Sequence, residues 1–165
     1  MISSLLFLAS STFALDAGDY APNFLLPAMN SKVAVKQLGV SDVAISQYIG
    51  PIPTVETNYL VLYFFDSKVP FKEIVDLNQV KLDYKEKKVQ ILAIYMDSDK
   101  RLLSELNRNR ISFPVLQDTY SIVARRYDVD SRQSCFILDS NSKFVQQKNC
   151  SKIKNLRDYL DRVFK

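Results

Sequence analysis

The stretch from Tyr59 to Met96, YLVLYFFDSKVPFKEIVDLNQVKLDYKEKKVQILAIYM, decides the fold class of this chain. It opens on a continuous apolar run, Tyr59 to Phe65, and closes on another, Val89 to Met96. Strands that are apolar on both faces are typical of the centre of a sheet covered by helices on both sides. Pro70 suits a first helical turn, and the spacing predicts a helix from there to about Lys85. Two strands joined in this way are predicted to be parallel neighbours in a right-handed crossover.

The predicted helix carries apolar side chains at helical spacing, and we expect one face of it to be buried. Asp66 and Ser67 are candidates for capping its free backbone amides. The residues expected on the buried face are Phe71, Ile74, Val75 and Leu82.

Upstream of this unit the sequence predicts a small hairpin. Ala21 to Pro27 forms a short extended segment bounded by prolines, and the alternation of Val43 to Ser46 suits its hairpin partner. Residues 29–41 between them are expected to form a surface excursion.

Downstream the pattern predicts two short helices around one extended segment. Ser98 is expected to cap a helix that carries Leu102, Leu103 and Leu106, and Asp118 to cap another that ends near Tyr127. The extended segment between them is Phe113 to Leu116.

The last part of the chain changes from parallel to antiparallel pairing. Cys135 to Leu138, a turn at residues 139–142 and Phe144-Val145 predict an antiparallel hairpin. A helix capped by Ser151 is expected to follow, with one apolar stripe made of Ile153, Leu156, Leu160 and Val163.

Composition excludes several classes of site. The 165 residues include no His, which removes Ser-His-Asp triads and imidazole metal sites, and only three Gly, so no phosphate-binding glycine motif occurs. Two Cys cannot form a four-thiolate zinc site, and Asp97 and Asp99 are followed by Lys100 and Arg101, which oppose a bound cation. The net charge of +4 is too small to imply nucleic acid. We therefore expect no metal and no cofactor.

The amino terminus predicts export. Residues 2–15 are apolar and uncharged, too short to span a bilayer as a helix, and polar Asp16 follows at once. We interpret residues 1–15 as a signal peptide processed near Ala14, with residues 18–165 as one domain. A buried N-terminal segment is the alternative. Export would make the chain periplasmic or otherwise exported, without a membrane span in its mature form and in a compartment that permits disulfides.

The order of elements and four sequence segments together resemble a known superfamily. The segments are Gly18 to Pro27, Val43 to Gly50, Phe113 to Asp118, and Tyr127 to Val129 followed by Phe136 to Asp139. They resemble the thioredoxin-like superfamily, in its peroxiredoxin (AhpC/TSA) and TlpA/ResA-type redoxin branch. The resemblance implies an α/β thioredoxin-like fold, a mixed central sheet flanked by helices, with an extra N-terminal β-hairpin.

The catalytic part of that pattern is missing. In the thiol oxidoreductases of this fold, a W-C-x-x-C motif opens the first long helix, where the helix dipole stabilises a thiolate. The matching residues here run from Lys68 to Lys72, with Val69 and Lys72 in place of the two cysteines, and no Cys precedes Ser134. The cis-proline that the resemblance implies before the hairpin strand is also absent, with Gln133 near its place.

The former active-site mouth is our candidate binding surface. The resemblance implies that the loop before the first long helix meets the loop before the hairpin strand. An apolar Val-Pro-Phe step surrounded by basic residues has the composition of a protein interface. The alternative is that Phe71 points into the core. The candidate residues are Lys68, Val69, Pro70, Phe71, Lys72, Arg132 and Gln133.

The two cysteines allow a disulfide across the last hairpin. Pairing about a turn centred near Asn141 places Cys135 opposite Gln147, so Cys150 is three residues out of register unless a bulge intervenes. The alternative is that Cys135 is a small buried hydrophobic residue.

We therefore predict a redox-inactive thioredoxin-like domain, not an enzyme, that serves as a protein-binding or structural component of a bacterial cell-envelope assembly. The first alternative is a thiol-disulfide oxidoreductase or peroxidase that uses Cys135 and Cys150 in a non-standard arrangement. The second is a carrier of a small ligand in the cleft left by the dithiol.

Overall fold

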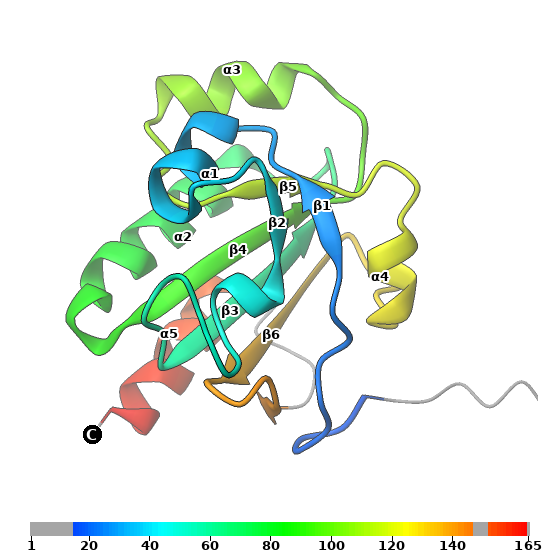
Figure 1. The fold of residues 1–165 in the computed structure, drawn as a ribbon. Helices are drawn as coiled ribbons and strands as arrows, with labels where there is room; N and C mark the ends of the chain where they lie inside the picture. The colour runs from blue at the N-terminus through cyan, green and yellow to red at the C-terminus, as the bar shows by residue number, and fades with distance from the viewer. Residues whose placement is uncertain (1–14, 147–151, 165) are drawn as a thin grey trace, which may run out of the picture.

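The computed structural model describes residues 15–146 and 152–164, and a five-stranded sheet lies at its centre (Figure 1). The strand order is β5-β4-β3-β6-β7. β3 (Tyr59–Phe65) and β4 (Val89–Tyr95) are parallel, with Tyr59 opposite Val89, as the sequence predicts. β5 (Val115–Gln117) extends the parallel half of the sheet.

The other half of the sheet is antiparallel. β6 (Gln133–Asp139) runs antiparallel to β3, and β7 (Phe144–Gln146) pairs with β6. The predicted mixed sheet is therefore confirmed. A β-bulge shifts the register by one residue between Ile137 and Leu138.

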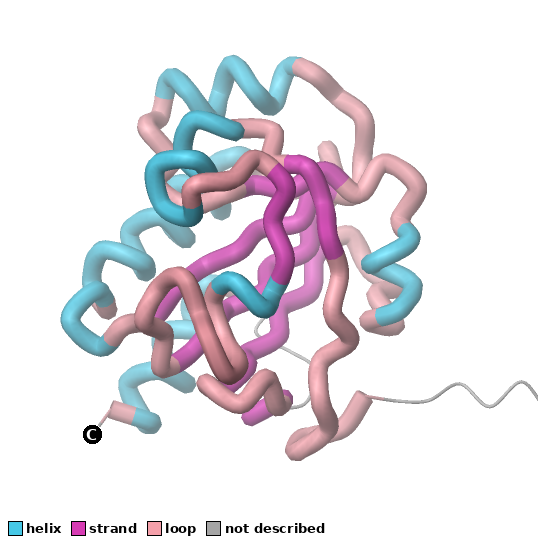
Figure 2. The backbone as a smooth tube through the Cα atoms, viewed as in Figure 1, coloured by secondary structure: helices cyan, strands magenta, loops and turns pink. Residues whose placement is uncertain are grey.

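Helices cover both faces of the sheet (Figure 2). Alternation along β3 divides the core, because successive side chains point to opposite faces. Val61 and Tyr63 pack with α2 (Phe71–Asp83), α3 (Arg101–Arg108) and α5 (Ile153–Val163). Leu60 and Leu62 pack with α1 (Ser31–Leu38) and α4 (Ile122–Arg126). Two short 3-10 turns, Ile45–Gln47 and Lys85–Lys87, complete the described elements.

The N-terminal hairpin forms, but its connection differs from the prediction. β1 (Leu25–Pro27) pairs antiparallel with β2 (Asp42–Ala44). The expected surface excursion at residues 29–41 is instead helix α1, which buries Ala34 and Leu38. Its anchor is the buried side chain of Asn30, which donates to the Phe113 carbonyl and accepts from the Val115 amide, both at 2.9 Å.

Helix α2 buries a different stripe from the predicted one. Ile74, Leu77 and Val80 are buried, whereas Phe71 is only half-buried. Val75 and Leu82 are 38% and 52% exposed. Residues seven apart share one side of a helix, and this pair lies on a flank about 100° from Ile74, away from the sheet.

Capping is confirmed for one predicted residue and corrected for another. The Asp118 carboxylate accepts from the amides of Ile122 and Ala124, both at 2.9 Å, and so caps α4. At α3, Asp99 rather than Ser98 accepts the amide of Arg101, at 2.9 Å. Only Leu106 is buried on α3, and Leu103 is exposed.

The predicted stripe of α5 is confirmed in its three buried positions. Ile153, Leu156 and Leu160 are buried, and Val163 is half-buried. The predicted cap, Ser151, lies outside the described residues.

Candidate functional site

The end of β3 and the start of α2 form the mouth that the sequence argument singled out. The Asp66 amide donates to the Arg132 carbonyl at 3.0 Å, and Phe65 pairs with Gln133 across the sheet. The loop before α2 and the loop before β6 therefore meet at one sheet edge, as expected.

The turn itself is held by its own polar groups. Asp66 Oδ1 accepts the Lys68 amide at 2.8 Å, and the Asp66 carbonyl accepts the Val69 amide at 3.2 Å. In the thiol enzymes of this fold, a sulfur at this place is stabilised by amides and by the helix N-terminus. Here the Lys68 amide already donates a hydrogen bond to the Asp66 carboxylate, and no residue of the turn carries a sulfur.

A groove of about 320 Å³ opens beside this turn. Its apolar lining includes Phe65, Phe71, Ile74, Tyr95 and Leu102. Charged side chains also line it, namely Asp66, Lys68, Asp99, Arg101 and Glu105. The groove thus runs between the first turn of α2 and helix α3.

The candidate residues divide between this groove and its surroundings. Lys68, Val69, Pro70 and Phe71 line the groove, with Val69 and Phe71 half-buried and both packed against the core. Lys72 points to solvent and pairs with Asp76 at 2.5 Å. Arg132 and Gln133 lie at the same sheet edge but do not line the groove.

Sequence reasoning missed the contribution of the segment that follows β4. Tyr95, Asp99, Arg101, Leu102 and Glu105 all line the groove. The signal was available, because parallel strands end at the same sheet edge, and binding sites gather at that edge. β3 and β4 are parallel neighbours, so the residues that follow the two strands lie at one edge of the sheet.

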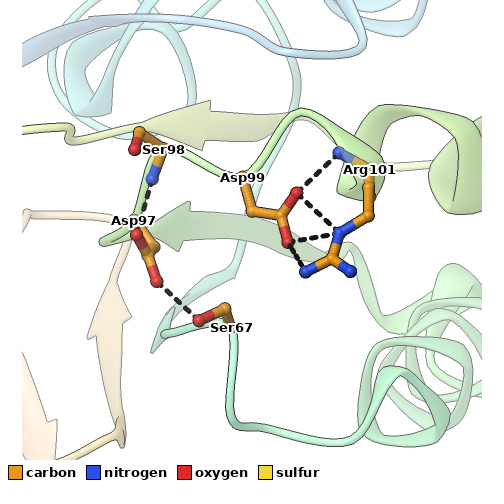
Figure 3. A network of polar contacts seen from close by, with 5 residues as sticks. All are labelled: Ser67, Asp97, Ser98, Asp99 and Arg101. Carbon is orange, nitrogen blue, oxygen red and sulfur yellow. Dashed lines mark hydrogen bonds and ion pairs between the residues drawn. The ribbon is translucent and has the colours of Figure 1, made fainter.

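Three polar contacts lie in and beside this segment (Figure 3). Ser67 Oγ donates to Asp97 Oδ2 at 2.5 Å, and Asp97 Oδ1 accepts the Ser98 amide at 2.8 Å. Asp99 pairs with the guanidinium of Arg101 at 2.6 Å. The Ser67 hydroxyl lowers the pKa of Asp97, and Arg101 lowers that of Asp99. Both carboxylates are therefore charged at neutral pH and are poor general acids.

Beneath α2, two buried polar atoms, the Tyr63 hydroxyl and Glu73 Oε2, have no hydrogen-bond partner among the residues that the structure describes. Burial, and then the charge of Glu73, raise the pKa of Tyr63. Tyr63 lies opposite Cys135 in the sheet. A phenol held neutral in this way does not serve as a base or nucleophile at neutral pH.

Cys135 is buried in β6 opposite Tyr63, two residues before the end of β3, and does not lie on the β3–α2 turn. Its thiol is not free, because the sulfur is disulfide-bonded. Cys150, the candidate partner from the sequence, lies outside the described residues. The bulge between Ile137 and Leu138 shifts the register by one residue, fewer than the three by which simple hairpin pairing misses Cys150.

The described residues contain neither a metal-ligand cluster nor a membrane-spanning helix. No group of three or more His, Cys, Asp or Glu gathers there as metal ligands would. None of the helices within residues 15–146 and 152–164 has the length and apolarity needed to cross a membrane.

Comparison with known proteins decides the family. The model of the AhpC/TSA family matches residues 17–147, most of the chain. The chain belongs to the AhpC/TSA family. Among curated proteins, it is similar to a candidate peroxiredoxin of Buchnera aphidicola, with 22% identity over 91% of this chain and 84% of that protein.

Solved structures of the thioredoxin-like fold resemble this AhpC/TSA member along most of its length. A candidate thiol:disulfide interchange protein DsbE from Chlorobium tepidum has a TM-score of 0.71 and 23% identity, covering 91% of this chain and 96% of that one. The mitochondrial 2-Cys peroxiredoxin of Plasmodium falciparum has a TM-score of 0.68 and 20% identity, covering 90% and 94%. The thioredoxin-like fold is thereby confirmed.

Proposed function

We propose that this AhpC/TSA domain has lost thiol chemistry and acts as a protein-binding component of a bacterial cell-envelope assembly. The observation that carries the proposal is the β3–α2 turn, which is formed and ordered but has no cysteine. A thiolate there is the attacking group of thiol-disulfide exchange, and neither valine nor lysine replaces it.

The position of Cys135 argues against a relocated active site. It is buried in a central strand and already bonded, whereas reactive cysteines are partly exposed and lie in electropositive surroundings. The rival proposal, an oxidoreductase or peroxidase that works through Cys135 and Cys150, would need this sulfur to become accessible.

The groove beside the turn has the chemistry of a peptide-binding surface. Phe71 and Leu102 offer apolar area, and Lys68, Arg101 and Glu105 offer charges of both signs around it. An apolar centre with a polar rim is the usual composition of an interface. We infer that a partner inserts an apolar side chain beside Phe71 and pairs its charges with the rim.

The proposed location rests on the sequence. An uncharged apolar run at residues 2–15 before Asp16 has the composition of a signal peptide core. We propose that the mature domain works outside the cytoplasm.

Redox activity is tested with insulin reduction and with thioredoxin-dependent peroxide consumption by the pure protein. Turnover is expected to equal that of a control without the protein. Robust turnover that disappears in Cys135→Ser or Cys150→Ser would establish the rival enzyme instead.

Partner binding is tested by affinity purification from the native cell envelope with Phe71→Ala and a matched control, Val75→Ala. Both residues lie in α2, but only Phe71 lines the groove. Because Phe71 is half-buried, its truncation is expected to cost about 2 kcal/mol of stability, less than a full core residue. Partners are expected to be lost with Phe71→Ala and kept with Val75→Ala.

A third variant separates folding from binding. Val69→Asp places a charge on the same surface, and combining it with Gln133→Arg alters both loops that meet at this edge. If this double variant folds normally and recovers every partner at the wild-type level, the mouth is not the docking surface.

A further inference from the structure

A second and larger groove lies between α1 and the C-terminal half of α2. Its volume is about 750 Å³, within the range of small-molecule sites. It shares no lining residue with the groove beside the β3–α2 turn. The residues that line it are Lys32, Val33, Lys36, Gln37, Val55, Lys81, Leu82, Lys85, Gln90 and Ser112.

The charges around this groove are all of one sign. Lys32 and Lys36 of α1 line it together with Lys81 of α2 and Lys85 of the following 3-10 turn, and within the described part of the chain no acidic residue lines the cavity. Among the described residues, none of these four lysines takes part in an ion pair. Like charges around one cavity repel, and a bound anion would replace that repulsion with attraction.

The groove also has an apolar lining. Leu82 is 52% exposed and lines it together with Val33 and Val55. A leucine exposed in this way leaves apolar area that a ligand with a hydrocarbon part would remove from water. The favoured ligand is therefore amphipathic rather than a simple inorganic ion.

The ammonium of Lys81 is held by hydrogen bonding in the wall of the groove. Lys81 is half-buried, and its Nζ donates to the Ser112 carbonyl at 2.6 Å. The same carbonyl accepts Gln37 Nε2 at 2.8 Å, and Asn78 Oδ1 accepts both the amide and the hydroxyl of Ser112. These contacts hold the ammonium in place before any ligand arrives, which lowers the entropic cost of binding.

We propose that this groove binds a small amphipathic anion, with a carboxylate or phosphate group against Lys81 and its neighbouring lysines and an apolar body over Leu82. The proposal is independent of the lost thiol chemistry and of partner docking, because it uses different residues. The four lysines favour an anionic group, the apolar lining favours a hydrocarbon body, and the cavity volume is that of a small-molecule site.

The full-length protein is titrated calorimetrically with decanoate and with decyl phosphate, which separate the two headgroup chemistries. Saturable binding of one molecule per chain is expected for at least one of them. Decyltrimethylammonium, with the same chain and the opposite charge, and acetate or inorganic phosphate, without the chain, are expected to bind much more weakly. Equal binding of the cationic amphiphile, or no saturable binding of either anion, would overturn the proposal.

Site-specificity is tested with the double variant Lys36→Gln, Lys85→Gln and a charge-matched control, Lys100→Gln, Lys154→Gln. The control lysines are exposed and do not line the groove. Affinity is expected to fall by at least about tenfold in the first pair, a loss of about 1.4 kcal/mol, and to stay unchanged in the second.

Leu82→Asn gives a second variant should the lysine pair perturb folding, and it is expected to weaken the decyl ligands but not acetate. Equal affinity of the groove pair and the control pair, with both folded, would contradict the assigned site. Tighter binding of an oligoglutamate peptide than of either decyl anion would replace the small ligand with an acidic polypeptide.

Discussion

At the residue scale, buried polar side chains join segments that are far apart in the chain. Asn30 ties the start of α1 to the strand β5, and Asp118 ties the end of β5 to α4. Each satisfies backbone groups that would otherwise be buried without partners, which is costly. Asp118 could be predicted from sequence as a helix cap, whereas Asn30 could not, because both of its partners lie more than eighty residues away.

Asp118→Ala is expected to lower the free energy of unfolding by about 2 kcal/mol, because the amides of Ile122 and Ala124 lose their acceptor. Urea unfolding measures this loss. Thr119→Ala, at an exposed neighbouring position, is the control and should change stability little. A loss no greater than that of the control would show that the cap contributes nothing.

The lowered pKa of Lys81 is expected to make the stability of the protein depend on pH. Burial lowers its pKa to about 8 from an ordinary value of 10.5. Between these values the unfolded chain binds the proton more readily than the folded one, so the contribution of Lys81 to stability falls as pH drops from 10.5 towards 8.

The measurement is urea unfolding of the wild type and of Lys81→Met across the range from about 8 to 10.5. The stability of the wild type relative to the variant is expected to rise with pH. Other titrating groups, such as Tyr84, cancel in this difference because both proteins contain them. A difference that stays flat with pH would mean that Lys81 titrates normally.

At the element scale, the last hairpin and helix α2 show how burial departs from local pattern. The β6–β7 pair contains a bulge, and the residues of the hairpin turn give no sequence signal for it. In α2, the sheet lies against the side of Ile74, so the apolar flank of Val75 and Leu82 faces away from it. The bulge shifts the strand register near Cys135. The exposed flank of α2 supplies Leu82 to the apolar lining of the groove between α1 and α2.

The disulfide at the last hairpin leads to a prediction about the number of thiols that react before and after reduction. The protein unfolded without reductant is expected to show no reactive thiol, and two per chain after reduction, since the chain has two cysteines. A Cys135–Cys150 bond closes a loop of about 15 residues, and reducing it is expected to cost about 3 kcal/mol of stability. Two reactive thiols before reduction would exclude the bond.

At the scale of the whole molecule, the chain has the fold of the AhpC/TSA family but no cysteine at the start of α2. The sheet, the helices on both faces and the N-terminal hairpin are all present, and Val69 and Phe71 at the β3–α2 turn pack against the core. The fold therefore forms with Val69 and Lys72 where the thiol oxidoreductases of this fold carry cysteines.

Export is a prediction about the whole chain. The native protein is expected to begin near Leu15, because processing near Ala14 would remove the apolar run. N-terminal sequencing of protein from the native cell envelope measures this. Met1 intact on a cytosolic species would contradict both processing and the proposed location.

By itself, the sequence determined the order of elements, the parallel pairing of β3 with β4, and the absence of a thiol before Ser134. These follow from hydrophobic periodicity, chain connectivity and residue identity, which are local properties. Only the tertiary structure decided which flank of α2 is covered, that residues 31–38 form a helix, and that Tyr95 and Arg101 join the mouth. The four lysines likewise line one groove only in the folded chain, where Gln37 of α1 and Lys81 of α2 both donate to the Ser112 carbonyl, a meeting of distant segments that no local pattern specifies.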